Sequence, residues 1–126
     1  MRSSPATDAG GGSPDKGEAV ESESDGAMSH QTVALRDGVA DGYVIPLGPV
    51  NLVCAVAGHG MVGCGAFDVA ALDRFGYAAA RVRRADGAVA DVDDLLAAEV
   101  AEANDAARRQ GVAVGMDGRA ALELLR

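Results

Sequence analysis

Residues 51–68 constrain the fold more than any other stretch of this chain. They form two apolar runs separated by Gly58-His59-Gly60, in the order Asn-Leu-Val-Cys-Ala-Val-Ala-Gly-His-Gly-Met-Val-Gly-Cys-Gly-Ala-Phe-Asp. Short apolar runs bounded by turn residues indicate the strands of a β-hairpin. Because both runs are almost continuously apolar, we expect both faces of the hairpin to be covered, one by helices and the other by more protein.

The length of the turn decides how the two cysteines lie. If residues 58–60 form a three-residue turn, Cys54 lies opposite Cys64 and both thiols share one face. A turn that is one residue shorter offsets them, because the strands slide by one position. Either way, Cys54 with Cys64 is a candidate redox or metal pair. With His59 as a third side chain, however, it provides too few ligands for zinc.

The segment before the hairpin is also extended in character. Residues 32–36 and 43–47 are β-favouring runs joined by Asp-Gly turn dipeptides. Pro46 and Pro49 cannot donate ladder hydrogen bonds, so they place this region at a sheet edge, a bend or a strand end. A bare apolar edge favours pairing with another chain, which makes this β region a natural contact between copies.

After the hairpin, a helix and a further strand are predicted. Asp68 is suited to cap a helix on which Val69, Leu72 and Phe75 repeat at helical spacing, and Gly76 suits the residue after its end. Residues 77–82 are typical of a strand. The pattern predicts an α+β domain, with an N-terminal antiparallel meander around a central hairpin, then a helix, a strand and C-terminal helices.

Residues 91–126 carry the C-terminal helices. Asp91 and Asp94 resemble a capping box, and the apolar stripe that follows predicts either one helix over 92–110 or two helices with a break near 97–99. Asp117 then caps a last helix that carries Ala121, Leu122 and Leu125.

Composition excludes some classes of function. The chain has 126 residues and a net charge of −8, and Lys16 is its only lysine. Nucleic-acid binding needs clustered positive charge, so it is not expected. No run approaches the roughly 20 apolar residues of a membrane span, and the N-terminus lacks the apolar core of a signal peptide. We therefore expect a cytoplasmic protein with reduced cysteines and no membrane contact.

Domain organisation follows from the same composition. Residues 1–29 are rich in Ser, Gly and acidic residues and predict a disordered leader, with translation beginning at Met1 or at Met28. Residues 30–126 form one domain. Aromatic residues make up 3% of the chain and tryptophan is absent, so the core is built from small side chains that bury little area each. That shortage favours self-association.

Three segments carry a family resemblance. They are residues 60–68, residues 94–96 and residues 111–122, and the Cys-Gly and Gly-Met-x-Gly-Arg elements within them are the most specific. In this order they resemble the YunC-like family, which is catalogued as domain of unknown function 1805. The resemblance implies a small α+β domain whose N-terminal β region mediates tetramerisation. It implies no established activity.

Cys64 is the best candidate for a reactive group. Gly63 and Gly65 flank it and leave room for a ligand or another backbone. A nucleophilic role needs a neighbouring base or helix N-terminus that favours the thiolate. A packed core cysteine is the competing interpretation. His59, at the hairpin tip, is most simply an exposed turn residue, with a general base as the alternative.

Residues 115–119 are the strongest candidate for ligand binding. A small anion would bind at Gly115, Asp117, Gly118 and Arg119, because a helix N-terminus exposes amides and Arg119 adds positive charge. Capping by Asp117 competes for the same amides. No P-loop, dinucleotide fingerprint or catalytic triad order is present, and we predict no cofactor and no metal.

Two functions remain open from the sequence. The first is a homo-oligomeric binding or structural module without catalysis, which associates through its N-terminal β region. The second is a small thiol-dependent enzyme, or a redox or ligand sensor, that uses Cys64 with an anion site at 115–119.

Overall fold

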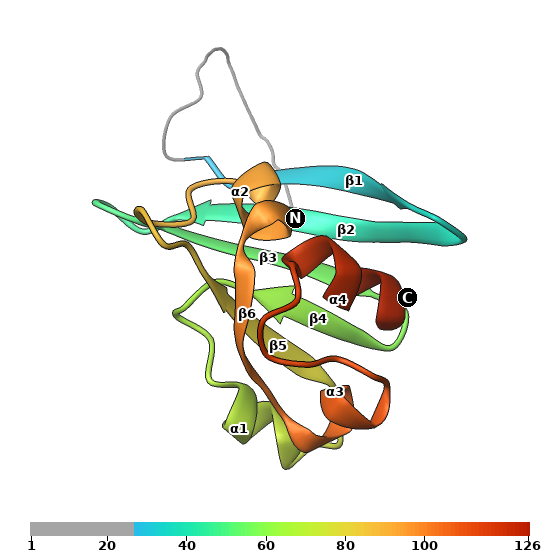
Figure 1. Ribbon diagram of the computed structural model, residues 1–126. Coiled ribbons are helices and arrows are strands. Elements are labelled where there is room, and N and C mark those ends of the chain that lie inside the picture. Colours follow the sequence, from blue (N-terminus) through green and yellow to red (C-terminus); the bar gives the residue numbers. More distant parts are fainter. Residues whose placement is uncertain (1–26) are drawn as a thin grey trace.

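The computed structural model describes residues 27–126, which form an α+β fold around one six-stranded sheet (Figure 1). The strands lie in the sheet in the same order as in the sequence. All neighbours are antiparallel except β4 and β5, which are parallel. The predicted fold class is therefore confirmed. The elements are β1 (Ser29–Leu35), β2 (Gly38–Pro46), β3 (Asn51–Ala57), β4 (Gly60–Gly63), α1 (Val69–Asp73), β5 (Ala79–Arg83), α2 (Val92–Ala97), β6 (Glu99–Ala103), α3 (Asp105–Arg109) and α4 (Gly118–Leu124).

The predicted leader lies almost wholly outside the described residues. The structure begins at residue 27, and Ser29, the last residue of the predicted leader, is already the first residue of β1. The alternative start at Met28 is likewise untested and stays a prediction.

The turn of the central hairpin has two residues, not three. Ala57 pairs with Gly60, so Cys54 pairs with Gly63 and not with Cys64. The shorter of the two predicted turns is thus the one observed. The residue after the turn is held by a tertiary contact: a Cβ on Gly60 would lie 2.6 Å from the carbonyl oxygen of Ala78, so this position accommodates only glycine. The tip is held as well, because the His59 amide donates to the carbonyl of Leu125 at 2.7 Å.

The two faces of the sheet differ in their cover. In Figure 1, α2 and α4 lie in front of the sheet, and α1 lies apart from them at the lower end of the molecule. On the face under α2 and α4, which we call the covered face, Val53, Ala55 and Val62 are fully buried, and they belong to the same core as Leu95 and Leu122. This face holds the main hydrophobic core.

The opposite face, which we call the open face, lacks comparable cover by the described residues. We define it by five apolar side chains that alternate with the buried ones: Val39, Tyr43 and Ile45 of β2, and Cys54 and Val56 of β3. Asp41 of β2 lies on the same face, between Val39 and Tyr43. Only α1 packs on this side, where Met61, Val69 and Ala79 form a small second cluster at the β4–β5 end. Among residues 27–126, the predicted cover of the hairpin is present on one face and only partial on the other.

Helix α1 is shorter than the predicted apolar stripe. Asp68 caps it as expected, accepting a hydrogen bond from the amide of Ala71 at 3.0 Å. Val69 is buried, but the helix ends at Asp73 and Phe75 is 82% exposed. The placement of Phe75 on the buried stripe is therefore wrong, because the chain leaves the helix there and turns through Gly76, whose φ is 69°.

The segment from residue 92 to residue 110 is a helix, a strand and a second helix. The predicted stripe conceals β6 between α2 and α3. Val100 gives the reason, since its amide donates to the carbonyl of Met116 at 2.8 Å and its carbonyl accepts from the amide of Gly115 at 2.9 Å. β6 is thus bonded to β5 on one side and to residues 115–117 on the other. The predicted break near residues 97–99 is present, but the strand that follows it was missed.

The predicted helix caps are confirmed. Asp91 accepts from the amide of Asp94 at 2.8 Å, and the Asp94 carboxylate accepts from the amide of Ala90 at 3.0 Å. Asp117 accepts from the amide of Ala120 at 2.7 Å and starts α4, whose Ala121 and Leu122 are fully buried. These side chains satisfy amides that a helix N-terminus leaves without partners.

Asn104 connects helices α1 and α3 to strand β5. It is the only buried polar side chain among residues 27–126, with 5% of its surface exposed. Its Oδ1 accepts from the amides of Ala79 and Ala107, and its Nδ2 donates to the carbonyls of Val69 and Tyr77. These four bonds connect α1, β5 and α3 at one end of the sheet.

None of the helices within residues 27–126 has the length and apolar character needed to cross a bilayer.

Candidate functional site

Cys64 lies where two parallel strands end. β4 ends at Gly63 and β5 at Arg83, and because they run in parallel, their C-terminal ends meet at one edge of the sheet. Cys64 is only 6% exposed and belongs to the main core. It also lines a cavity of about 320 Å³ beneath the loop that follows β5. Cys64 therefore packs in the core and also lines a cavity.

The two glycines beside Cys64 have different reasons to be glycine. A Cβ on Gly63 would lie 2.4 Å from the Phe67 ring and 2.9 Å from Met61 Cε, so the packing at this position leaves no room for a side chain. A Cβ on Gly65 would meet nothing within 4 Å. Gly65 also lines the cavity, so the predicted open approach to Cys64 exists on the Gly65 side only.

The two arginines at the end of β5 differ in their partners. Arg84 is held by Asp86 and Asp94, each 3.2 Å from its guanidinium, and it donates to the carbonyl of Ala88 at 3.3 Å. Arg83 is exposed and makes no ion pair within the described part of the chain, even with Glu99, its partner across the β5–β6 ladder. Both arginines line the Cys64 cavity. Neither was singled out from the sequence, and the signal that would have found them is their position after a strand parallel to β4.

Cys54 and Cys64 lie towards different faces of the sheet. Cys54 is half-buried against the second cluster on the open face, whereas Cys64 belongs to the main core, and both are free thiols. Burial raises the pKa of the Cys54 thiol above its ordinary value, and negative charge on Cys64 raises it further. Burial likewise raises the pKa of Tyr77, with charge on Cys54 as the second cause. These shifts favour the protonated, less nucleophilic form of Cys54.

Residues 115–119 use their amides inside the fold. The amide of Gly115 donates to Val100, that of Gly118 to Ala98, and Asp117 accepts from Ala120. A Cβ on Gly118 would lie 2.2 Å from the carbonyl oxygen of Leu95, so this glycine lets α4 pack closely on α2. Asp117 thus acts as the competing interpretation has it, as a cap.

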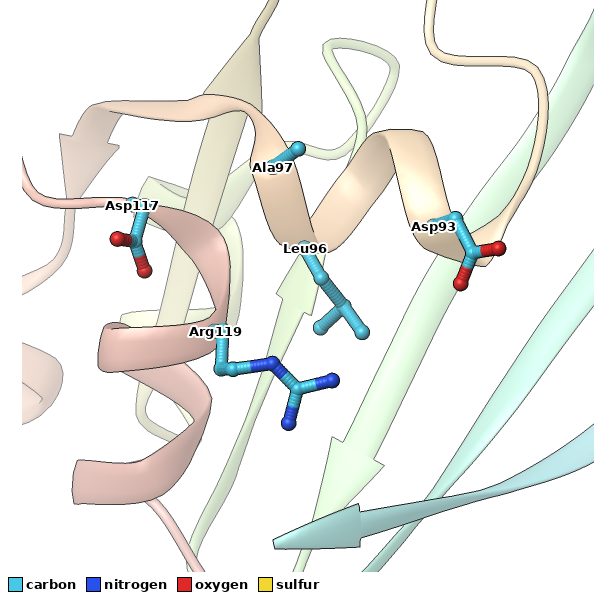
Figure 2. Close-up of a pocket in the computed structure, with 5 residues that line it drawn as sticks. All are labelled: Asp93, Leu96, Ala97, Asp117 and Arg119. Carbon is cyan, nitrogen blue, oxygen red and sulfur yellow. The ribbon is translucent and has the colours of Figure 1, made fainter.

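Arg119 points into a second cavity. Figure 2 shows its side chain reaching from α4 into the space beside Leu96 of α2, with Asp93 at the far end of that helix. The cavity measures about 340 Å³, and its lining includes Asp117 as well. Arg119 already donates to the carbonyl of Ala34 at 3.1 Å. Two carboxylates and one engaged guanidinium offer little to an anion, and anion binding here stays a prediction.

His59 makes hydrogen bonds within the fold at the hairpin tip. Its Nδ1 lies 2.7 Å from the carbonyl oxygen of Arg126, and Gln110 Nε2 donates to the His59 carbonyl at 3.0 Å. The imidazole thereby ties the hairpin to the end of α4. Within residues 27–126, no three side chains of the His, Cys, Asp or Glu type gather as metal ligands would.

The structure does not bring the two predicted sites together. Cys64 and Gly65 line one cavity and Asp117 and Arg119 line another, with no residue in common. A joint site therefore has no geometric support within one chain.

Comparison with known proteins places the chain in a family. The family described as "Domain of unknown function (DUF1805)" matches residues 63–125, half of the sequence. The chain belongs to the DUF1805 family. The match begins at Gly63, so the residues predicted to bind a ligand (63–65 and 115–119) lie inside the DUF1805 segment, whereas Cys54, His59 and strands β1, β2 and β3 lie outside it.

A solved structure shares the fold of this DUF1805 protein. It is that of a protein of unknown function, TA1206, from Thermoplasma acidophilum, with a TM-score of 0.69 and 24% sequence identity. The match covers 79% of this chain and 94% of the other. At this identity the likeness concerns the fold alone. No curated protein matches the sequence.

Proposed function

We propose that this DUF1805 domain is a homo-oligomeric binding or structural module, a tetramer in solution, whose subunits meet through the open face and the β1 edge. The observation that supports it best is the apolar character of the open face. Val39 is 63% exposed, and Tyr43 and Ile45 pack against neither hydrophobic cluster. The side chains on a solvated sheet face are normally polar, so apolar residues at these positions favour burial against another chain.

The β1 edge supports the same proposal. Within residues 27–126, β1 pairs only with β2, and its seven residues include no proline and no Lys, Arg, Asp or Glu. Such an edge lacks the features with which single-chain sheets avoid edge-to-edge pairing. By contrast, the outer edge of β6 is bonded to residues 115–117.

Polar side chains lie next to the apolar ones on the open face, since Asp41 lies between Val39 and Tyr43 on β2 and opposite Val56. His30 Nε2 lies 2.8 Å from Asp41 Oδ1, and the His30 and Tyr43 rings are 5.0 Å apart. Protein interfaces combine apolar area with hydrogen-bonding groups of this kind.

The alternative, a thiol-dependent enzyme or sensor, has weaker support. It needs Cys64 and residues 115–119 to act together, and these line separate cavities. A module without catalysis of its own requires neither.

Light scattering of the full-length chain after size exclusion tests the proposal. At about 10 µM we expect the mass of a tetramer. Ile45→Asp on the open face should lower that mass, because burying an unpaired carboxylate costs several kcal/mol.

A matched pair of valines controls for surface charge. Val39 on the open face and Val114 in the loop before α4 are 63% and 65% exposed. Val39→Asp should weaken assembly, and Val114→Asp should leave the mass unchanged. A monomeric wild-type chain would refute the proposal, and so would equal effects of the two aspartates.

A further inference from the structure

The cavity beside Cys64 lies at a position where ligands commonly bind. In β-α-β units, small molecules bind outside the carboxyl ends of the parallel strands. Here β4, α1 and β5 form such a unit, and the cavity opens beyond Gly63 and Arg83. The loop of residues 83–90 forms one wall and residues 50–51 another.

The size and lining of this cavity define a small ligand with an apolar body. A volume of about 320 Å³ is at the lower end of the range for ligand sites, about 300–1,000 Å³. Most of its wall is aliphatic, with Val50, Val82, Ala88 and Val89 beside the Cys64 thiol. Over Gly65 the space is open, since a side chain there would contact nothing within 4 Å.

The charge at the cavity comes from the two arginines. Arg84 is neutralised by Asp86 and Asp94. Arg83 lines the same cavity, is exposed, and has no ion pair among residues 27–126. A guanidinium binds a carboxylate with two parallel hydrogen bonds.

We propose that this cavity binds a small monocarboxylate, with the carboxylate on Arg83 and an apolar body against Val82, Val89 and the Cys64 thiol. The site lies on the side of Cys64 that Gly65 leaves open. It is separate from the proposed assembly surface, so binding and oligomeric mass can fail independently.

Titration of the ¹⁵N-labelled full-length protein followed by NMR tests the site. Benzoate is the probe, and benzamide is the neutral molecule of the same shape. Benzoate should shift the amide resonances of Gly65, Ala66 and Val89 saturably at millimolar concentrations. Benzamide should bind at least about tenfold more weakly, because it lacks the charge-assisted hydrogen bonds.

Three variants assign the binding to these residues. Arg83→Gln should weaken benzoate binding about tenfold or more without changing benzamide binding, and Gly65→Leu should fill the cavity and abolish both. Gly38→Leu is the control, because Gly38 also has nothing within 4 Å of its Cβ position and does not line the cavity.

The same spectra show whether each variant is folded. Absence of saturable shifts up to about 10 mM, equal binding of benzoate and benzamide, or unchanged benzoate binding by Arg83→Gln would each overturn the proposal.

Discussion

Strand β3 is apolar on both faces of the sheet, but helices cover the two faces unequally. On β3, Val53 and Ala55 point to the covered face and are fully buried, whereas Cys54 and Val56 point to the open face and are only half-buried. The same seven-residue strand thus supplies both environments. A continuously apolar strand predicts that both of its sides are covered, and residues 27–126 cover one side of β3 fully and the other only in part.

The same contrast separates the two cysteines. Cys64, on the covered side, is buried beside a cavity, and Cys54, on the open side, lies between the Tyr43 strand and the α1 cluster. The two thiols are therefore in different surroundings, and both are free in this structure.

Replacing Asn104 should have the largest effect, because it breaks the link between the helices of the two faces. Asn104→Ala removes four hydrogen bonds from groups at the end of the sheet. At about 1–3 kcal/mol for each buried group left unpaired, we expect a loss on the order of 4 kcal/mol in the free energy of unfolding, measured by urea denaturation.

Asn51→Ala is its control. Asn51 donates one exposed hydrogen bond, to the carbonyl of Ala90 at 2.9 Å, so a loss of about 1 kcal/mol or less is expected. A small loss of unfolding free energy in Asn104→Ala would mean that the packing of α1 and α3 at the end of the sheet does not depend on this residue.

Two valines of β3 compare the faces directly. Val53→Ala on the covered face should cost about 2–3 kcal/mol of unfolding free energy, through lost burial and the cavity left behind. Val56→Ala on the open face should cost less than about 1 kcal/mol in the monomer.

Protein concentration sharpens this second comparison. If assembly covers the open face, the cost of Val56→Ala should rise with protein concentration, because association adds to stability by mass action. Chemical denaturation at two concentrations measures it. Equal losses of unfolding free energy for Val53→Ala and Val56→Ala in a monomeric protein would show that Val56 is buried as fully as Val53.

The smallest effect is expected in alkaline solution. The pKa values of Cys54 and Tyr77 are raised in the folded protein, so the folded state holds both protons more tightly than the unfolded state. This stabilisation is complete below the unfolded pKa values, about 8.5 and 10, and is lost as the pH rises through the folded ones.

Denaturation curves between about pH 7 and pH 11 test this on the open face. The free energy of unfolding should fall above about pH 9, and Cys54→Ala with Tyr77→Phe should reduce the fall. The double variant and the wild type should show the same pH dependence near pH 7. An unchanged alkaline slope in the variant would contradict the burial of these two groups.

Local chemistry made part of this fold predictable. Asp68, Asp91 and Asp117 were each identified as helix caps, and each accepts a hydrogen bond from an amide three residues later. A cap depends only on residues within one turn of the chain, so no knowledge of the fold was needed.

Long-range contacts decided the parts that sequence reasoning missed. β6 satisfies helical spacing, yet it is a strand because β5 and residues 115–117 supply its hydrogen bonds. The sequence left the length of the turn at Gly58-His59 open, and in the fold the Gly60 that follows it lies against the carbonyl of Ala78. Phe75 matched the apolar stripe, but nothing in the stripe shows that α1 ends at Asp73.

The candidate site shows the same division. Cys64 and Gly65 were found from the sequence, but Arg83 and Arg84 reach their cavity only because β5 lies parallel to β4. Gly118 was interpreted as an exposed amide, and its neighbour across the fold, the Leu95 carbonyl, gives the actual reason for a glycine.

By itself, then, the sequence determined the α+β class, the central hairpin, the helix starts and the apolar character of both sides of β3, since these follow from periodicity and from contacts within a few residues. Only the tertiary structure decided the turn length, the β6 strand, the four bonds of Asn104 and the separation of the two predicted sites. These features depend on which distant backbone groups come within hydrogen-bonding or van der Waals distance, and that is a property of the packed chain as a whole.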